Sequence, residues 1–331
     1  MIQIDCQDGF SETVAFPADG KHFVGGVGGK IRRWRVEDGK EVGTPMEAGQ
    51  SIIGIAVSRD GKWIVSGTIS DGVTVWDAVS HEKVPVKLQT DVGMVFAIDV
   101  SPDGTNVATG SGDATACIWS LATGEQVLGP LRHDNVVVGV KFSPDGRFIA
   151  TAMEHHANSV RIYDSLNGRL VVHFPITISD SSFNESLAWA SDNGRLFALS
   201  SDGSISCLDV STGTTLSQWP IHGYAPTSIA LASNGTFVAV AAGTSVSFWD
   251  TATNERIGSV VEQTAPITSM AISINGDIVT TTGFTITLSG LGGILPSSYH
   301  DLGVASTFVS LCKDSLTTDC LRWSVMGTSR P

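Results

Sequence analysis

The chain has 331 residues with 42% hydrophobic side chains, enough to bury the core of one large domain or two smaller ones. Asp and Glu number 33 against 20 Lys and Arg, and the formal net charge of −13 disfavours nucleic acid as a general partner. No apolar run approaches the roughly 18 residues of a membrane span, and no basic segment precedes an apolar one at the start. We therefore expect neither a membrane-bound protein nor a signal peptide.

Taken from the N-terminus, the first predicted element is a strand at residues 2–6, where apolar and polar side chains alternate. The segment Gly25-Gly26-Val27-Gly28-Gly29-Lys30 then invites comparison with a phosphate-binding loop. Val24 stands where that motif needs its first glycine, Ile31 stands where it needs Ser or Thr, and no helix follows. We interpret the segment as a turn.

The next predicted strand carries the one candidate basic patch, which consists of Lys30, Arg32, Arg33 and Arg35. Strand alternation places Arg33 and Arg35 on one face and Arg32 on the other. We interpret these residues as solvated strand positions rather than as a binding surface.

Residues 94–125 define the unit on which the rest of the chain is organised. Alternation predicts a strand at 95–100, which Ser-Pro-Asp-Gly at 101–104 ends with a turn. A second strand begins at Val107, a turn follows at Gly112-Asp113, and a third strand at 115–121 contains Trp119.

This unit recurs seven times along the chain. The turn glycine returns every 41–48 residues, and an aromatic or apolar anchor on the third strand returns every 39–45 residues. The glycines are Gly20, Gly61, Gly104, Gly146, Gly194, Gly235 and Gly276. The anchors are Trp34, Trp76, Trp119, Tyr163, Leu208, Trp249 and Leu288. Two independent markers therefore give the same period and the same count.

The third strands include the segments VTVWD (Val73–Asp77), VRIYD (Val160–Asp164) and VSFWD (Val246–Asp250). Period, turn chemistry and the Trp-Asp dipeptide together resemble the WD-repeat family over nearly the whole chain up to Ser289. The resemblance implies an all-β fold, a seven-bladed β-propeller of four-stranded antiparallel blades. It also implies that the outer strand of one blade comes from the neighbouring repeat.

We expect one propeller domain at residues 1–289 and an irregular or poorly ordered tail at 290–331. The strand within residues 1–7 is expected to complete blade seven, and residues 307–311 are the alternative closing strand. The first repeat starts almost at Met1. The chain is therefore also compatible with the C-terminal sensor domain of a larger signalling protein.

Some blades of the family carry a hydrogen-bonded set of His, Ser or Thr, Asp and Trp. His133 and His222 match the His position, and Asp71, Asp113 and Asp202 match the Asp position. No repeat clearly holds all four members. A net hydrogen bond contributes about 0.5–1.5 kcal/mol, whereas truncation of a buried Trp costs about 3–5 kcal/mol, so we expect packing to hold the incomplete blades.

The five cysteines are scattered and form no Cys-x-x-Cys pair, so we expect a reducing compartment, cytoplasmic with nuclear as the alternative. Glu154-His155-His156 could suggest zinc, but alternation separates the two histidines and no third ligand is identifiable. We expect no metal, no cofactor, no catalytic residues and no enzymatic activity. A propeller hydrolase or metal enzyme using Glu154, His155 and His156 is the alternative.

The resemblance implies a non-catalytic scaffold or adaptor that binds a protein or peptide on one face, as a monomer or as a subunit of a larger complex. We expect that face to carry the loops before the first strand of each blade and between strands two and three. Residues 176–185 add extra length to one of these loops. The candidate binding residues are Phe10, Asp91, Met94, Asp134, Glu154, His155, Phe183, Glu185, Tyr224 and Phe284.

Overall fold

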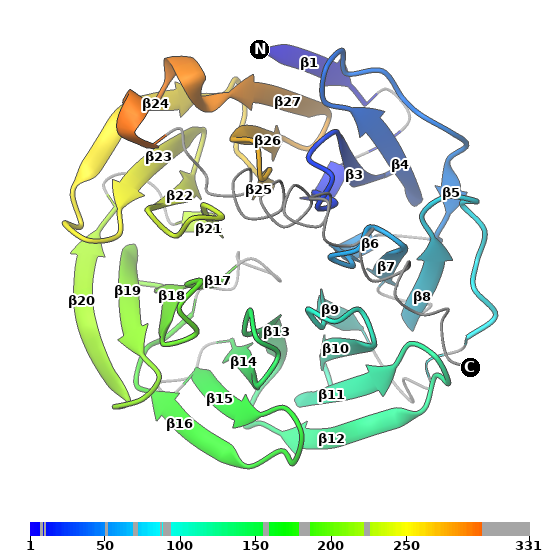
Figure 1. The fold of residues 1–331 in the computed structure, drawn as a ribbon, viewed down its shortest axis with the longest axis vertical. Coiled ribbons are helices and arrows are strands. Elements are labelled where there is room, and N and C mark those ends of the chain that lie inside the picture. Colours follow the sequence, from blue (N-terminus) through cyan, green and yellow to red (C-terminus); the bar gives the residue numbers. More distant parts are fainter. Residues whose placement is uncertain are drawn as a thin grey trace, which may run out of the picture.

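The computed structural model describes residues 1–6, 9, 11–49, 52–68, 72–86, 88, 94–154, 159–178, 186–221 and 226–299. These residues form seven antiparallel sheets arranged as the blades of a ring (Figure 1). The predicted all-β class and the seven-bladed propeller are confirmed.

The first four blades take the chain from Ser11 to Phe174. Blade one contains β2 (Ser11–Ala15), β3 (His22–Val27), β4 (Lys30–Arg35) and β5 (Met46–Glu47). Blade two contains β6 (Ile52–Val57), β7 (Trp63–Thr68) and β8 (Gly72–Asp77). Blade three contains β9 (Val95–Val100), β10 (Asn106–Ser111), β11 (Thr115–Ser120) and β12 (Gln126–Arg132). Blade four contains β13 (Val137–Phe142), β14 (Phe148–Met153), β15 (Val160–Asp164) and β16 (Leu170–Phe174).

Three more blades complete the ring. Blade five contains β17 (Leu187–Trp189), β18 (Arg195–Leu199), β19 (Ser204–Asp209) and β20 (Thr214–Pro220). Blade six contains β21 (Pro226–Leu231), β22 (Phe237–Ala242), β23 (Ser245–Asp250) and β24 (Arg256–Glu262). Blade seven contains β25 (Ser269–Ile272), β26 (Asp277–Thr281), β27 (Thr285–Gly290) and, as its outer strand, β1 (Ile2–Asp5). Two short 3-10 helices follow, η1 (Leu291–Gly293) and η2 (Ser297–Tyr299).

Blade two departs from the four-stranded pattern in the part of the chain that is described, since its sheet has three strands there. An isolated bridge joins Trp76 to Lys83, and the Val84 N–H donates to the Val75 carbonyl at 2.9 Å. Leu88 is buried against this blade. The chain beyond β8 therefore runs along the outer edge of the blade without extended strand pairing.

The N-terminal strand closes the ring by pairing with the last strand of the seventh sheet. Ile2 faces Leu288, Ile4 faces Ile286, and the Cys6 N–H donates to the Phe284 carbonyl at 2.8 Å. The two ends of the ring are thus joined through backbone hydrogen bonds, which leaves no open edge at the seam. The alternative closing segment, 307–311, lies outside the described residues.

The first turn of every blade requires a residue in the left-handed backbone region. Six of the predicted glycines occupy it, with φ between 58° and 82°. In blade five Asn193 takes this conformation at φ 57°, one position before Gly194. Asn is among the few non-glycine residues that tolerate this region, so the turn is shifted by one residue without being lost.

The hydrophobic core is divided among the interfaces between neighbouring blades, with one buried cluster at each of the seven interfaces. Trp119, for example, is 5% exposed and packs with residues of blade two such as Val75. A single sheet cannot cover both of its own faces, so each blade depends on two neighbours for its burial.

Residues 291–299 extend the packed structure past the last strand of blade seven. Leu291 and Leu295 are buried in the cluster between blades six and seven, and Tyr299 Oη donates to the Asp250 carboxylate at 2.7 Å. The two 3-10 helices therefore cover the outer side of blade six. Residues 300–331 lie outside the described residues.

We expect Tyr299→Phe to lower the free energy of unfolding by about 1 kcal/mol, because it deletes one partly exposed hydrogen bond to a carboxylate. Chemical denaturation of the full chain measures this difference. Ser298→Ala, at an exposed neighbouring position, is the matched control and should leave the stability unchanged. Equal stability of Tyr299→Phe and wild type would contradict the anchoring role of this contact.

Candidate functional site

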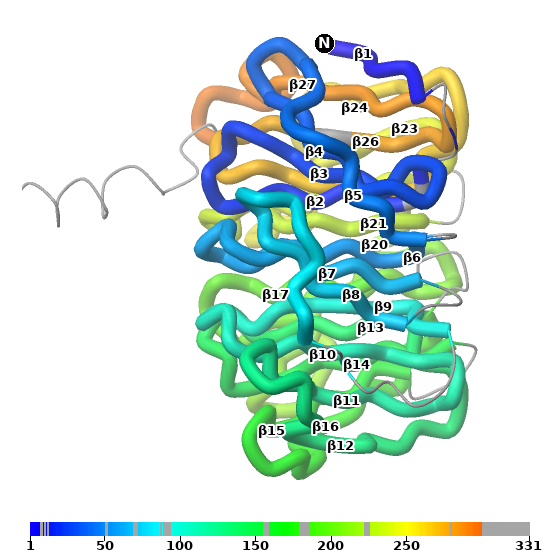
Figure 2. Tube along the Cα trace, turned by 90° about the vertical axis from the view of Figure 1, so that its right-hand side faces the viewer, coloured from blue at the N-terminus to red at the C-terminus, as the bar shows by residue number. Residues whose placement is uncertain are grey.

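The antiparallel order of the strands determines which connections share a face. Connections into each blade's first strand and between its second and third strands emerge at one end, which we call the loop face. The first and third turns of every blade emerge at the opposite end, which we call the turn face. Figure 2 shows the ring from the side, with the two faces on opposite sides.

Four of the ten candidate binding residues are described, and all four lie on the loop face. Met94 precedes β9 and Phe284 lies between β26 and β27, with exposed fractions of 43% and 62%. Their backbones are fixed, because Gly112 N–H donates to the Met94 carbonyl and Cys6 N–H to the Phe284 carbonyl. These two apolar side chains are therefore presented to solvent from rigid backbone, in blades three and seven.

Asp134 and Glu154 come together on adjacent loops of blade four. The Asn135 side-chain amide donates to the Glu154 carbonyl at 3.0 Å, and Glu154 forms a parallel bridge with Ile178. The side chain of Asp134 forms an ion pair with Arg161. The other six candidates lie outside the described residues: Phe10, Asp91, His155, Phe183, Glu185 and Tyr224.

Part of the hydrogen-bonded set is seen among the described residues, while His222 and Asp71 lie outside them. Trp119 Nε1–H donates to Thr109 Oγ1, and Trp76 Nε1–H donates to Ser66 Oγ, each at 2.9 Å. In blade six the Trp249 indole instead donates to Ser247 on its own strand.

Blade four replaces the tryptophan with Tyr163 and builds a polar cluster around His133. Its Nδ1–H donates to the Leu131 carbonyl at 2.8 Å, and Nε2 accepts from the Thr151 hydroxyl at 2.9 Å. The Leu131 carbonyl can only accept, so Nδ1 carries a hydrogen and Nε2 is the acceptor in the neutral imidazole. Burial is the main cause that lowers the pKa of His133 to about 4.

The basic strand of blade one is not a free patch. Lys30 pairs with Glu47, Arg32 with Glu41, Arg33 with Asp19 and Arg35 with Asp38, at N–O distances of 2.9–3.6 Å. Lys30 and Arg35 are among the more exposed side chains of this strand, at 39% and 46%, whereas Arg32 and Arg33 are 18–20% exposed. In the glycine-rich segment only Gly28 and Gly29 form the turn, at positive φ, whereas Gly25 to Val27 belong to β3 and Lys30 begins β4.

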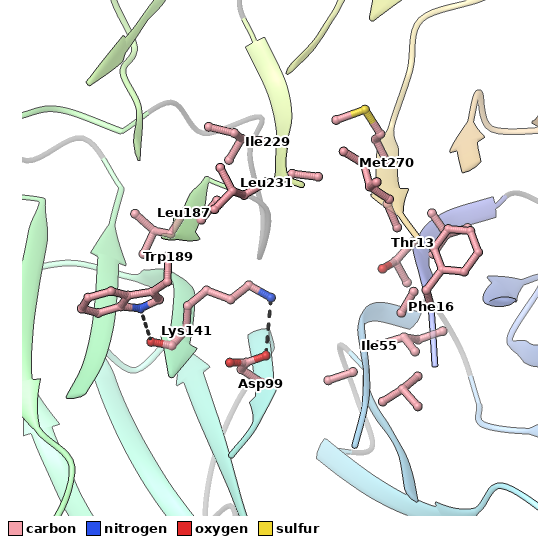
Figure 3. Close-up of a pocket in the computed structure, with 18 residues that line it drawn as sticks. Thr13, Phe16, Ile55, Asp99, Lys141, Leu187, Trp189, Ile229, Leu231 and Met270 are labelled. Carbon is pink, nitrogen blue, oxygen red and sulfur yellow. Dashed lines mark hydrogen bonds and ion pairs between the residues drawn. The ribbon is translucent and has the colours of Figure 1, made fainter. Parts of the chain in front are cut away.

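A cavity of about 350 Å³ lies on the axis of the ring, where the innermost strands of all seven blades meet (Figure 3). Its lining comes from the second half of each first strand, so it lies toward the turn face rather than the loop face. The lining residues have apolar side chains apart from Thr13, Asp99 and Lys141, but polar atoms make up about half of the surface that faces the hollow. The side chains of Leu187, Trp189 and Met270 are among those drawn in Figure 3.

The repeat pattern explains how these two charged residues reach the axis. Five residues before the positive-φ residue of the first turn, five blades have alanine: Ala15, Ala56, Ala188, Ala230 and Ala271. Blades three and four have Asp99 and Lys141 at this position, and all seven residues line the cavity. No sequence motif marks this pair, but superimposing the seven repeats on the turn residue reveals it.

Among the described residues, no group of three or more His, Cys, Asp or Glu could hold a metal ion. Cys6, Cys117 and Cys207 are buried, and burial raises the pKa of the Cys117 and Cys207 thiols. The described part of the chain has no helix long and apolar enough to cross a membrane.

Comparison with known families places WD repeats in this chain. The family described as "WD domain, G-beta repeat" matches residues 39–77, 86–120 and 126–164. Each matched segment ends on a third strand, at Asp77, Ser120 and Asp164. The predicted resemblance to the WD-repeat family is confirmed.

Curated relatives match about half of the chain. The small ribosomal subunit protein RACK1y of Oryza sativa subsp. japonica is 34% identical over 45% of this chain and 44% of that protein. The eukaryotic translation initiation factor 3 subunit I of Lodderomyces elongisporus is 26% identical over 53% of this chain and 52% of that protein. The nuclear distribution protein nudF of Emericella nidulans is 29% identical over 49% of this chain and 40% of that protein. The chain thus spans about half the length of the curated relatives it matches.

Proposed function

We propose that this WD-repeat propeller is a non-catalytic platform that binds a protein or peptide on its loop face. The observation that carries the proposal is the exposure of Phe284 and Met94 on that face, on backbone held by hydrogen bonds to neighbouring segments. Aromatic and methionine side chains are enriched where protein interfaces gain most of their binding energy. Rigid loops on a closed ring limit the entropy lost on binding.

The named relatives are consistent with membership in a larger assembly. One carries the name of a ribosomal subunit protein and another that of an initiation factor subunit. By analogy with these names, we propose that this chain acts in the cytoplasm as a component of a protein complex. The proposed role requires no cofactor.

The loop face can be tested by affinity capture of the tagged chain from its source-cell extract, with partners identified by mass spectrometry. We expect the double variant Met94→Ala, Phe284→Ala to bind a captured protein about tenfold more weakly, because it removes two exposed apolar contacts. Binding of the purified partner to each variant gives the affinity.

Val79→Ala is the matched control, because Val79 is 85% exposed but lies in a turn on the opposite face. It should bind the partner as wild type does. If the loop-face variant and Val79→Ala behaved alike, the loop face would not be the docking surface. A folded chain that captured no protein would count against the platform role itself.

A further inference from the structure

The two charged side chains in the axial cavity differ in how far the protein satisfies them. Asp99 Oδ2 accepts the Phe142 backbone N–H at 2.8 Å, and Oδ1 lies 3.6 Å from Lys141 Nζ. Among the described residues, the Lys141 ammonium forms its ion pair with Asp99 alone, at this long distance. The ammonium has three N–H donors. Lys141 therefore keeps hydrogen-bonding capacity directed into the cavity (Figure 3).

Both groups remain accessible from the channel. The side chain of Lys141 is 29% exposed and that of Asp99 is 21% exposed. Alanine at the equivalent position of the other five blades leaves room around them. The two charged groups thus lie together in a hollow whose other lining side chains are apolar apart from Thr13, and a few placed polar groups among apolar side chains are typical of small-molecule sites.

We propose that the axial cavity binds an apolar monocarboxylate, with the carboxylate on Lys141 Nζ and the hydrocarbon chain along the apolar walls of blades five to seven. This site is separate from the loop-face function, because it lies toward the turn face. Its volume of about 350 Å³ falls within the range of roughly 300–1,000 Å³ found for small-molecule pockets.

The charge arrangement selects an acid over an amine. A ligand ammonium would need to approach Asp99, which already accepts a backbone hydrogen bond, and it would be repelled by Lys141. A ligand carboxylate can accept hydrogen bonds from the remaining N–H donors of Lys141. Apolar side chains nearby strengthen the electrostatic attraction between the two charges. Burial, only partly offset by Lys141 and the Phe142 N–H, raises the pKa of Asp99 above its ordinary value.

The walls fix the orientation of the ligand chain. Trp189 Nε1–H donates to the Lys141 carbonyl at 3.0 Å, and its ring stacks on Phe148 with centroids 6.5 Å apart. The indole is therefore held between blades four and five beside the Lys141 backbone, and Leu187 and Leu231 also line the cavity. A straight hydrocarbon chain attached to the carboxylate would lie against these side chains.

Isothermal titration calorimetry with octanoate tests the proposal on the full chain. We expect saturable binding at one site, and we expect Lys141→Met, which keeps the length of the side chain but removes its charge, to weaken it at least tenfold. Lys40→Met is the control, because Lys40 is 76% exposed on blade one, and it should bind octanoate as wild type does. Octylamine should bind at least tenfold more weakly than octanoate.

Tryptophan fluorescence locates the ligand, since octanoate should change the emission of wild type but not that of Trp189→Phe. Unaltered octanoate affinity in folded Lys141→Met, or octylamine binding equal to octanoate, would overturn the proposal. Absence of saturable octanoate binding, with Lys141→Met and Asp99→Asn lowering Tm equally, would also overturn it and leave the pair as a clamp between blades three and four.

Discussion

Replacing Trp119 by alanine is expected to lower the free energy of unfolding by about 3–5 kcal/mol, the range for truncation of a buried Trp. Trp119 is 5% exposed, and its indole fills the interface between blades two and three. The change also leaves Thr109 Oγ1 without its donor at 2.9 Å. Because each blade is covered by its neighbours, the cavity left behind weakens two blades at once.

Urea denaturation measures the effect, and two variants divide it into parts. Trp119→Phe keeps most of the packing and loses the indole hydrogen bond, so it should cost less than Trp119→Ala. Trp249→Ala is the matched control at the equivalent position of blade six, where the side chain is only partly buried and its indole bonds to Ser247. A smaller loss for Trp119→Ala than for Trp249→Ala would contradict the packing role assigned to Trp119.

The fold was accessible from the sequence because its determinants repeat. A misread turn in one repeat is corrected by six others, as at blade five, where Asn193 rather than Gly194 adopts positive φ. The third-strand anchors, Leu208 and Leu288 included, all fall on the third strands of their blades. Two features could not be predicted in this way. The irregular outer edge of blade two has no motif that recurs in the other repeats, and the packing of Leu295 against blade six depends on residues far apart in the sequence.

The candidate sites were less accessible, because function resides where repeats differ from one another. Loop positions such as Met94 could be assigned to a face by strand order alone, but the pairing of Asp134 with Arg161 depends on side chains 27 residues apart. The Asp99–Lys141 pair could have been found from the sequence. Both residues occupy the same position in the repeat, where the other five blades have alanine. A deviation at an inward-facing repeat position is thus a useful signal for a site.

His133 illustrates how one blade depends on a group that must remain neutral. Its imidazole is buried beside Tyr163, with ring centroids 5.7 Å apart, and both ring nitrogens are engaged. Protonation would place a second donor against the Thr151 hydroxyl in surroundings that solvate charge poorly. Burial, assisted by the nearby charge of Arg161 and opposed by the Leu131 carbonyl and Asp134, lowers the pKa from 6.5 to about 4.

This shift predicts a stability that falls as the pH decreases from 6.5 towards about 4. Between these pH values the unfolded chain binds a proton at His133 that the folded chain does not. The contribution of the neutral histidine to the free energy of unfolding is therefore fully present above pH 6.5, and it is lost as the pH falls to about 4. The full shift corresponds to about 3 kcal/mol at about 1.4 kcal/mol per pKa unit.

The measurement is the urea unfolding free energy of wild type and His133→Gln across this range. Carboxylates with lowered pKa values, such as Asp60, weaken both proteins alike, so the difference between the two isolates the histidine. Parallel curves would show that His133 does not titrate with the lowered pKa, whereas a steeper fall for wild type would identify it as the acid-labile point of blade four.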